Sequence, residues 1–283
     1  MIFLTGATGK IGGETAKQLL EQGASLRALV RDEAKAADLK AAGAELVVGD
    51  IADADTVRRG MDGADKAFLL LPNGEQQEAN EKQFTDLAVA AGVKHFVKMS
   101  SMEAVADAET PIPRAHWAAE EYIRASGLNW TMVKPNFFMQ NLLASAASIK
   151  EKRKFFLPMG DGRTGMADAR DIGAVCAEVL TGSGHAGQSY EITGPEILTF
   201  YDVADRFTKV LGEKVEYVPM PMEAFRERMT GILQPWHLDA VCELFREIAE
   251  IGLDNTTDTF KQLIGRDPIS VNQFIEDHIA LFK

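Results

Sequence analysis

Thr5-Gly6-Ala7-Thr8-Gly9-Lys10-Ile11-Gly12 is the stretch that decides the fold, because it joins a short apolar strand at residues 2–4 to a helical pattern starting near Ile11. Glycines in such a turn let the backbone bend tightly and approach a pyrophosphate, whose charge is then held by amide groups at the helix N-terminus. A tight turn without a ligand is the plain alternative. The position between a strand and a helix, at the head of a βαβ series, favours a dinucleotide-binding turn.

Outward from this turn, apolar runs of strand length alternate with helical patterns through the first half of the chain. The runs are almost continuously apolar, as expected for a sheet covered on both faces, and their spacing suits right-handed crossovers. The sequence therefore predicts an α/β fold, a Rossmann-type doubly wound parallel sheet with a smaller helix-rich C-terminal lobe. The predicted strands are residues 2–4, 25–30, 45–48, 66–71, 95–99 and 130–133.

The composition changes near residue 150, where a charge run is followed by aromatic, proline and glycine residues. We interpret residues 150–164 as the crossing between a NAD(P)-binding domain at 1–150 and a substrate-capping lobe at 151–283, with segments such as 165–193 able to return to the sheet. A capping box at Thr199 and Asp202 predicts the start of a helix that ends near Leu211. The other predicted elements of the lobe are a helix at 171–180, strands at 189–193 and 214–218, and mainly helix from 222 onward.

The overall charge and residue usage exclude several classes of protein. Thirty Lys and Arg against 42 Asp and Glu give a net charge of -12, which disfavours nucleic acid as a partner. No apolar run approaches the roughly 20 residues that span a bilayer, and a strand beginning at Met1 argues against a secretion signal. The two cysteines are expected to be reduced thiols packed in the interior, and the five histidines are too scattered to predict a metal site. We therefore expect a cytoplasmic protein without a membrane span.

The end of the second predicted strand bears on the type of nucleotide. Arg31 comes first, followed by Asp32 and, one turn later, Lys35. An arginine here pairs with the 2′-phosphate of NADPH, whereas an acid accepts hydrogen bonds from the ribose hydroxyls of NADH and repels that phosphate. The order of these residues favours NADPH over NADH, with a solvated strand-end cation as the alternative for Arg31.

Two further strand ends are candidates for contacts to the nucleotide. Asp50 and Ile51 follow the third strand, where a carboxylate can meet the adenine amine and an apolar side chain its ring; a helix N-cap is an equal alternative for Asp50. Leu70, Leu71 and Pro72 end the fourth strand and either face the middle of the cofactor or pack in the core.

Motifs along nearly the whole chain resemble the NmrA-like branch of the atypical short-chain dehydrogenase/reductase superfamily. Around His116 and residues 136–141 the pattern is similar to bacterial NAD(P)H:quinone oxidoreductases and triphenylmethane reductases. The resemblance implies the Rossmann-type fold and a nicotinamide nucleotide more firmly than it implies a substrate. The motifs are the glycine stretch at 5–12, Val30-Arg31, Gly49-Asp50, Ala91-Gly92-Val93-Lys94, Ala119-Glu120, and Gly160-Asp161-Gly162 through Asp171-Ile172.

The chain departs from the wider superfamily at the proton-donating pair. Other members carry Tyr-x-x-x-Lys on the helix after the fifth strand, where the lysine lowers the tyrosine pKa. Alignment on Ala119-Glu120 places Ile112 at the tyrosine position and His116 at the lysine position, and Tyr122 lies too far along the helix to substitute. Chemistry that needs a positioned proton donor or base is therefore hard to support. Hydride transfer to a conjugated acceptor is easier, because charge delocalises in the product.

The resemblance also indicates which residues surround the reacting end of the cofactor. His116 either orients cofactor or substrate or is only a hydrogen-bonded residue at a helix start, and Ser100 matches the superfamily serine but is reduced to hydrogen bonding. After the sixth strand, residues 134–141 offer a stiff apolar wall with polar anchors, with core packing as the alternative. Expected substrate contacts are Phe138, Asn141 and Trp117, and expected cofactor contacts are Gly6, Thr8, Gly9, Lys10, Ile11, Arg31, Lys35, Asp50, Ile51, Leu70, Leu71, Pro72, Ser100, Pro135, Asn136 and Phe137.

These observations predict an NADPH-dependent reductase of quinone-like or other conjugated apolar acceptors, bound between sheet and lobe, with His116 as the candidate catalytic residue. The partner is then a small molecule, and the protein a monomer or homodimer. An alternative is a redox sensor that binds NAD(P) without turnover, as the fungal founders of the branch are understood to do. Nucleotide-sugar epimerisation is disfavoured by Ile112 and His116.

Overall fold

The computed structural model describes residues 1–283, which form two compact units. Each unit is assembled from segments that are distant in the sequence, so neither is one continuous stretch. That residues 1–150 and 151–283 are separate domains stays a prediction, because compact units do not show which parts fold separately. The sheet unit comprises residues 1–109, 113–134 and 169–191, and the second unit comprises residues 110–112, 135–168 and 192–283.

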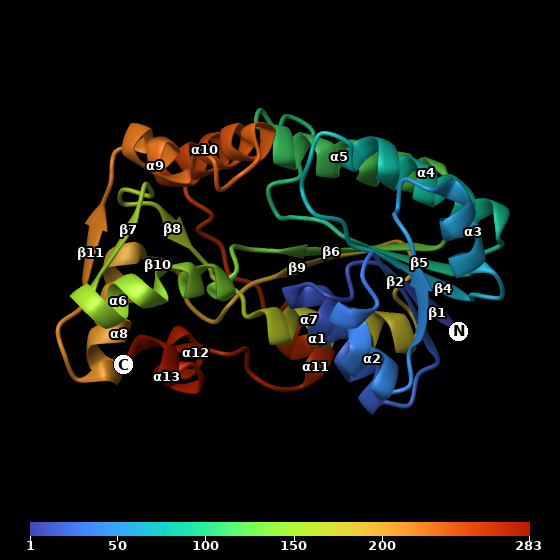
Figure 1. The fold of residues 1–283 in the computed structure, drawn as a ribbon, viewed down its shortest axis with the longest axis horizontal. Helices are drawn as coiled ribbons and strands as arrows, with labels where there is room; N and C mark the ends of the chain where they lie inside the picture. The colour runs from blue at the N-terminus through green and yellow to red at the C-terminus, as the bar shows by residue number, and fades with distance from the viewer. The chain divides into compact units, whose positions relative to one another are not determined.

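The sheet unit contains a seven-stranded sheet in the order β3-β2-β1-β4-β5-β6-β9 (Figure 1). The five pairings from β3 to β6 are all parallel, which confirms the predicted Rossmann-type sheet. The fourth strand ends two residues earlier than predicted and the sixth ends two residues later. The strands are β1 Ile2–Leu4, β2 Leu26–Val30, β3 Glu45–Val48, β4 Lys66–Leu69, β5 His95–Met99, β6 Trp130–Pro135 and β9 Gln188–Ile192.

Helices cover both faces of this sheet, with α3, α4 and α5 above it and α1, α2 and α7 below it in Figure 1. Coverage on both faces explains why the central strands are almost wholly apolar: Phe3, Phe68 and Val97 are completely buried. The helices of this part of the fold are α1 Lys10–Glu21, the 3-10 helix η1 Ala34–Ala36, α2 Ala37–Ala41, α3 Ala54–Met61, α4 Gln77–Ala90, α5 Pro111–Ala125 and α7 Ala169–Thr181.

The helix that follows the glycine turn, α1, packs closely against α7. A Cβ atom added at Gly173 of α7 would lie 2.8 Å from Cβ of Glu14 and 3.0 Å from the amide nitrogen of Thr15. Only glycine lets the two helix backbones approach this far. The position of α1 is therefore set by a segment more than 150 residues later in the chain.

The second unit has its own aromatic core and two small sheets, β11-β7 and β10-β8. Thr199 and Asp202 form the predicted capping box at the start of α8. The elements are η2 Met139–Ser145, α6 Ala146–Lys152, β7 Lys154–Leu157, β8 Arg163–Thr164, β10 Leu198–Thr199, α8 Phe200–Leu211, β11 Glu216–Pro219, α9 Met222–Met229, α10 Pro235–Glu250, α11 Thr259–Ile264, α12 Val271–Asp277 and α13 Ile279–Phe282.

Residues 150–164, which the sequence suggested as the crossing, hold the end of α6 and the strands β7 and β8 and lie inside the second unit. The strand β7 pairs in parallel with β11, and this brings the ring of Phe155 to 5.2 Å from that of Tyr217. A partner more than 60 residues away stabilises this strand, and local composition gives no sign of it. No helix in the chain is long and apolar enough to cross a membrane.

Candidate functional site

The glycine turn is fastened to the end of β4 by a buried threonine. Thr5 Oγ1 donates a hydrogen bond to the carbonyl oxygen of Leu70 at 3.0 Å, and the amide of Leu70 donates back to Thr5 Oγ1 at 2.8 Å. The Gly9 amide then closes the turn onto the Gly6 carbonyl at 2.9 Å. These three hydrogen bonds hold the turn in place against β4.

The three glycines of the turn meet different requirements. Gly6 has φ +73°, and a Cβ atom there would lie 2.9 Å from the Leu70 carbonyl oxygen. A Cβ at Gly12 would lie 2.1 Å from the Gly6 carbonyl oxygen, so this glycine is needed for the helix to pack on the turn. At Gly9 a Cβ would have only one neighbour, the Gly6 carbonyl oxygen at 3.3 Å. The fold thus requires glycine at Gly6 and Gly12 much more strictly than at Gly9.

The N-terminus of α1 is suited to an anion. Gly9 is its N-cap and supplies no side-chain cap, and the first turn contains no acidic residue. By contrast, Asp53 caps α3 and Thr199 caps α8 through their own side chains. The N-terminus of α1, with the positive end of its dipole and no side-chain cap, is suited to a phosphate, and the absent Cβ at Gly9 leaves room for it. The residues of this turn fit the pyrophosphate of a dinucleotide.

The remaining predicted residues of the turn lie at its surface or beneath it. Thr8 and Lys10 are exposed, while Ile11 is buried beneath the turn. Partial burial lowers the pKa of the Lys10 ammonium. Thr8 and Lys10 are thus accessible from solvent, and Ile11 supports the turn from within.

The residues predicted to select NADPH are exposed just beyond β2. Arg31, Asp32 and Lys35 all lie at the surface. Asp32 Oδ1 accepts a hydrogen bond from the backbone amide of Ala34 at 3.0 Å, so one of its carboxylate oxygens is used in the local turn. The guanidinium of Arg31, at the end of the strand, makes no hydrogen bond or ion pair within the protein. It could therefore contact a ligand without breaking an existing contact.

The residues after β3 and β4 combine local and core contacts. Asp50 Oδ1 accepts from the amide of Ala52 at 2.9 Å, and the N-cap of α3 is Asp53 instead of Asp50. Ile51 and Leu71 are half-buried against the core of the sheet unit. Leu70 contacts Gly6 as described, and Pro72 is exposed. Contacts of these residues to a nucleotide stay a prediction.

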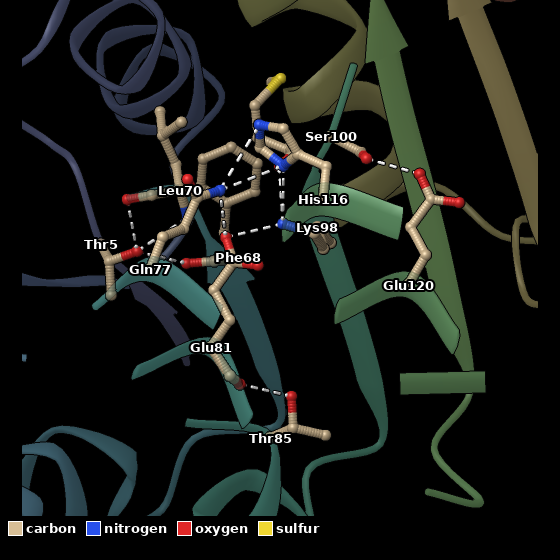
Figure 2. A network of polar contacts seen from close by, with 11 residues as sticks. Thr5, Phe68, Leu70, Gln77, Glu81, Thr85, Lys98, Ser100, His116 and Glu120 are labelled. Atoms are coloured by element: carbon tan, nitrogen blue, oxygen red, sulfur yellow. Dashed lines mark hydrogen bonds and ion pairs between the residues drawn. The ribbon is translucent and has the colours of Figure 1, made fainter. Parts of the chain in front are cut away.

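A cluster of four buried polar side chains, the Lys98 cluster, lies within the sheet unit beside the end of β5. Its members are Gln77 and Glu81 from α4, Lys98 from β5 and His116 from α5, and the most exposed of them, His116, is only 7% exposed. Figure 2 shows the side chains of Gln77, Lys98 and His116 pointing toward one another. Lys98 Nζ lies 2.7 Å from Glu81 Oε1 and 3.3 Å from His116 Nδ1. His116 is therefore part of a charged, water-excluded group.

The environment of the Lys98 cluster shifts two ionisation equilibria. Burial, followed by the positive charges of Lys98 and Lys134, holds the pKa of His116 well below its usual range. Burial also raises the pKa of Glu81, an effect that the neighbouring Lys98 opposes. The His116 ring is accordingly neutral at physiological pH.

A second buried group, the Glu120 cluster, adjoins the first and contains Ser100, Glu120, Arg124 and Lys134. Ser100 Oγ donates its hydrogen bond to Glu120 Oε1. Arg124 contacts the other carboxylate oxygen at 2.6 Å, and Lys134 Nζ lies 3.2 Å from Oε1. Because its single proton is already donated, Ser100 offers a ligand only acceptor lone pairs.

The side chains predicted after β6 are largely committed within the second unit. Asn136 Nδ2 donates to the Leu253 carbonyl at 3.0 Å, and Asn136 Oδ1 accepts from the Phe137 amide. The ring of Phe137 packs edge-on against Phe200, 6.0 Å away, in the core of this unit. Pro135 is buried at the end of β6, Phe138 is half-buried and Asn141 is exposed. Phe137 therefore packs in the core, which is the alternative that the sequence left open. Contacts of this segment to a ligand stay a prediction.

Residues on α5 agree with the lack of a tyrosine proton donor. Ile112 is buried in the first turn and carries no polar atom. Tyr122 donates instead to Asp86 at 2.7 Å on an exposed surface. The ring of Trp117 lies 5.2 Å from the Arg124 guanidinium, a cation–π contact that competes with the predicted substrate role.

Sequence reasoning missed Gln77, Glu81 and Lys98 as members of this site. It used Glu120 only as an alignment marker and Lys134 only as the first residue of the segment 134–141. A lysine within the apolar strand His95–Met99, and another near the end of β6, were the signals available. A charge in a strand buried on both faces requires a buried partner. The identity of that partner depends on which helix faces the strand, and the sequence alone does not give this.

Comparison with known proteins identifies relatives along the whole chain. A family model described as the NmrA-like family matches residues 1–275. The chain is 37% identical over 285 residues to the NAD(P)H azoreductase of Xenophilus azovorans, covering 100% of this chain and 99% of that protein. It is 31% identical over 287 residues to the (4-alkanoyl-5-oxo-2,5-dihydrofuran-3-yl)methyl phosphate reductase of Streptomyces griseus, covering 100% and 99%. The NADPH-dependent quinone oxidoreductase of Escherichia coli complexed with NADPH has a TM-score of 0.87 at 26% identity, covering 99% of this chain and 100% of that chain.

Proposed function

Since the chain belongs to the NmrA-like family, we propose that it is an NADPH-dependent reductase that transfers hydride to a quinone-like or other conjugated apolar acceptor. The observation that carries the proposal is the combination of an intact, uncapped glycine turn with a proton-donor position occupied by Ile112. The first part favours a bound dinucleotide, and the second disfavours chemistry that needs an acid on the helix after β5.

The protein's own contribution would be binding and orientation. The amides at the start of α1 would hold the pyrophosphate, and the exposed guanidinium of Arg31 would pair with the 2′-phosphate. Bound nicotinamide would supply the hydride. Neutral His116 would hydrogen-bond cofactor or acceptor without supplying the charge of an imidazolium. Catalysis would then rest mainly on holding donor and acceptor in a reactive geometry.

The named substrates of the relatives support this class of acceptor. An azo group, a quinone and an alkanoyl dihydrofuranone all take electrons into conjugated π systems. Reduction of such a system places negative charge on delocalised atoms, so water can deliver the proton afterwards. A simple ketone gives a localised alkoxide and needs a proton donor at once.

Rapid mixing of the purified chain with NADPH and a panel of quinones, azo dyes and unconjugated ketones tests the proposal. We expect loss of NADPH absorbance within a single turnover for the conjugated acceptors only. NADPH binding without oxidation by any acceptor would contradict the proposal and favour a nucleotide sensor. Oxidation by ketones and quinones at equal rates would contradict the proposed acceptor class.

A further inference from the structure

The contacts of Lys98 Nζ account for every proton of an ammonium group. The Nζ atom lies 2.7 Å from Glu81 Oε1, 3.2 Å from the Met99 carbonyl oxygen and 3.3 Å from His116 Nδ1. An ammonium has three N–H donors and no acceptor, and here it faces three acceptors at a completely buried position. The match assigns Nδ1 of His116 as an acceptor, so the ring carries its proton on Nε2.

The charged groups around His116 agree with this assignment. Lys98 on β5 and Lys134 on β6 are positive, whereas Glu81 on α4 contacts Lys98 and not the ring. Glu120, on the same helix as His116, is held by Arg124, Lys134 and Ser100. No carboxylate contacts the imidazole, so nothing offsets the cost of protonating it beside an ammonium.

Gln77 leaves the Nε2 proton of the ring available. Its amide nitrogen lies 3.3 Å from Glu81 Oε1, a contact that keeps the N–H side of the amide toward the carboxylate. The same nitrogen lies 3.3 Å from His116 Nδ1, which can accept from it as well as from Lys98, and 3.5 Å from His116 Nε2. With the ring proton on Nε2, the longer contact joins two N–H groups and is not a hydrogen bond. The Nε2–H group is therefore a donor without an acceptor inside the cluster.

We propose that Lys98, held by Glu81, is a positioning residue that keeps His116 neutral and presents its Nε2–H as a fixed hydrogen-bond donor to the acceptor or cofactor. The chemical role rests on the proposed function, whereas the state of the ring follows from the cluster alone. In this role His116 orients an oxygen of the ligand and is not a source of protons.

Nitrogen NMR of the full chain labelled with ¹⁵N-histidine tests the state of the ring without nucleotide or turnover. The variant His116→Gln identifies the signals of His116 among those of the five histidines. We expect an unprotonated Nδ1 and a protonated Nε2 down to about pH 5.5, a pH at which an ordinary histidine is mostly charged. A proton on Nδ1, or an imidazolium above that pH, would overturn the proposal.

The double variant Lys98→Met/Glu81→Gln tests whether Lys98 is responsible. It replaces the buried ion pair with uncharged side chains of similar size. We expect the proton affinity of His116 to rise about tenfold or more. The matched control is Lys82→Met/Glu78→Gln, which changes an exposed pair on the same helix and leaves the His116 signals unchanged. An unaltered proton affinity in the first variant would show that burial alone keeps the ring neutral, and would overturn the role of Lys98.

The pH dependence of turnover tests the neutral state of His116 independently. With a quinone acceptor, kcat of the wild type is expected to be flat across the range in which free histidine titrates, about pH 5.5 to 8, and to acquire a pH dependence in the double variant. A wild-type kcat that follows a histidine-like titration would overturn the proposal. If no acceptor is reduced, the proposed function fails, while the NMR result still decides how Lys98 acts on His116.

Discussion

The glycine turn and the Lys98 cluster lie in the same sheet unit but meet opposite demands. At the turn, what matters is the absence of side chains: a Cβ at Gly9 would meet only the Gly6 carbonyl oxygen, at 3.3 Å, so the space beside this backbone is open. In the Lys98 cluster, four polar side chains fill a buried space, and one contact is an ion pair at 2.7 Å. The comparison teaches that the proposed anion site needs bare backbone, whereas the cluster needs charges that are paired away from water.

The largest expected effect is a loss of nucleotide affinity, caused by a substitution in the glycine turn that leaves the fold intact. We expect Gly9→Val to reduce NADPH affinity by about 10²- to 10⁴-fold, because it removes two or more hydrogen bonds to charged phosphate oxygens at about 1.5 to 3 kcal/mol each. Circular dichroism alongside nucleotide titration separates binding from folding. Gly12→Ala is the contrast: its Cβ would lie 2.1 Å from the Gly6 carbonyl oxygen, so it lowers the stability of the fold itself. Retained affinity in Gly9→Val would show that the turn is structural only.

The next effect concerns the stability of the Lys98 cluster. Lys98→Met alone leaves Glu81 buried without its cation, and we expect the free energy of unfolding to fall by about 3 to 5 kcal/mol. Adding Glu81→Gln removes the stranded charge and recovers most of this loss. Denaturant unfolding of both variants measures the difference. A single variant as stable as the wild type would mean that the pair is not charged in the folded protein.

A smaller effect concerns nucleotide choice at the end of β2. Arg31→Ala removes a charge-assisted hydrogen bond to the 2′-phosphate, so NADPH binding weakens by about 1.5 to 3 kcal/mol while NADH binding is almost unchanged. Calorimetric titration of both nucleotides provides the measurement. Lys17→Ala, which removes an exposed cation on α1 that is not among the predicted cofactor contacts, serves as a comparison for general loss of positive charge. Equal losses for NADPH and NADH would remove Arg31 from the specificity site.

The smallest expected effect is on turnover. His116→Ala removes a hydrogen-bond donor, and we expect quinone reduction to slow by less than about tenfold, well short of the 10² to 10⁴ lost with a general acid. Rates for a quinone and an unconjugated ketone are compared in wild type and variant. Efficient ketone reduction that collapses in the variant would identify His116 as a proton donor and contradict the neutral state described above.

The same contrast explains what could be predicted from the sequence. The turn is local: residues 5–12 contain its glycines, and the sequence predicted it together with the parallel sheet around it. The cluster is built from residues 77, 81, 98 and 116, which come from α4, β5 and α5, and no spacing in the chain reveals that they meet. His116 was recognised from its neighbours on one helix, but its contact with Lys98, on a strand, could not be predicted from that helix.

Long-range pairing limited the prediction of the second unit in the same way. Phe155 belongs to a strand whose partner, β11, begins 61 residues later, so residues 150–164 had the composition of a loop. Helices in this unit were predicted more easily, because a helix satisfies its own backbone hydrogen bonds and carries its own cap, as Thr199 does for α8.

The tight contact of α1 with α7 at Gly173 has a consequence for the order of events during synthesis. The ribosome releases the glycine turn first, yet the helix that carries it gains its packing partner only when residues 169–181 have emerged, and β9 completes the sheet after that. A nascent chain stopped at residue 150 lacks both elements, so a nucleotide added at that stage has no finished site to stabilise. Assembly of the sheet unit is thus a late, long-range step of synthesis.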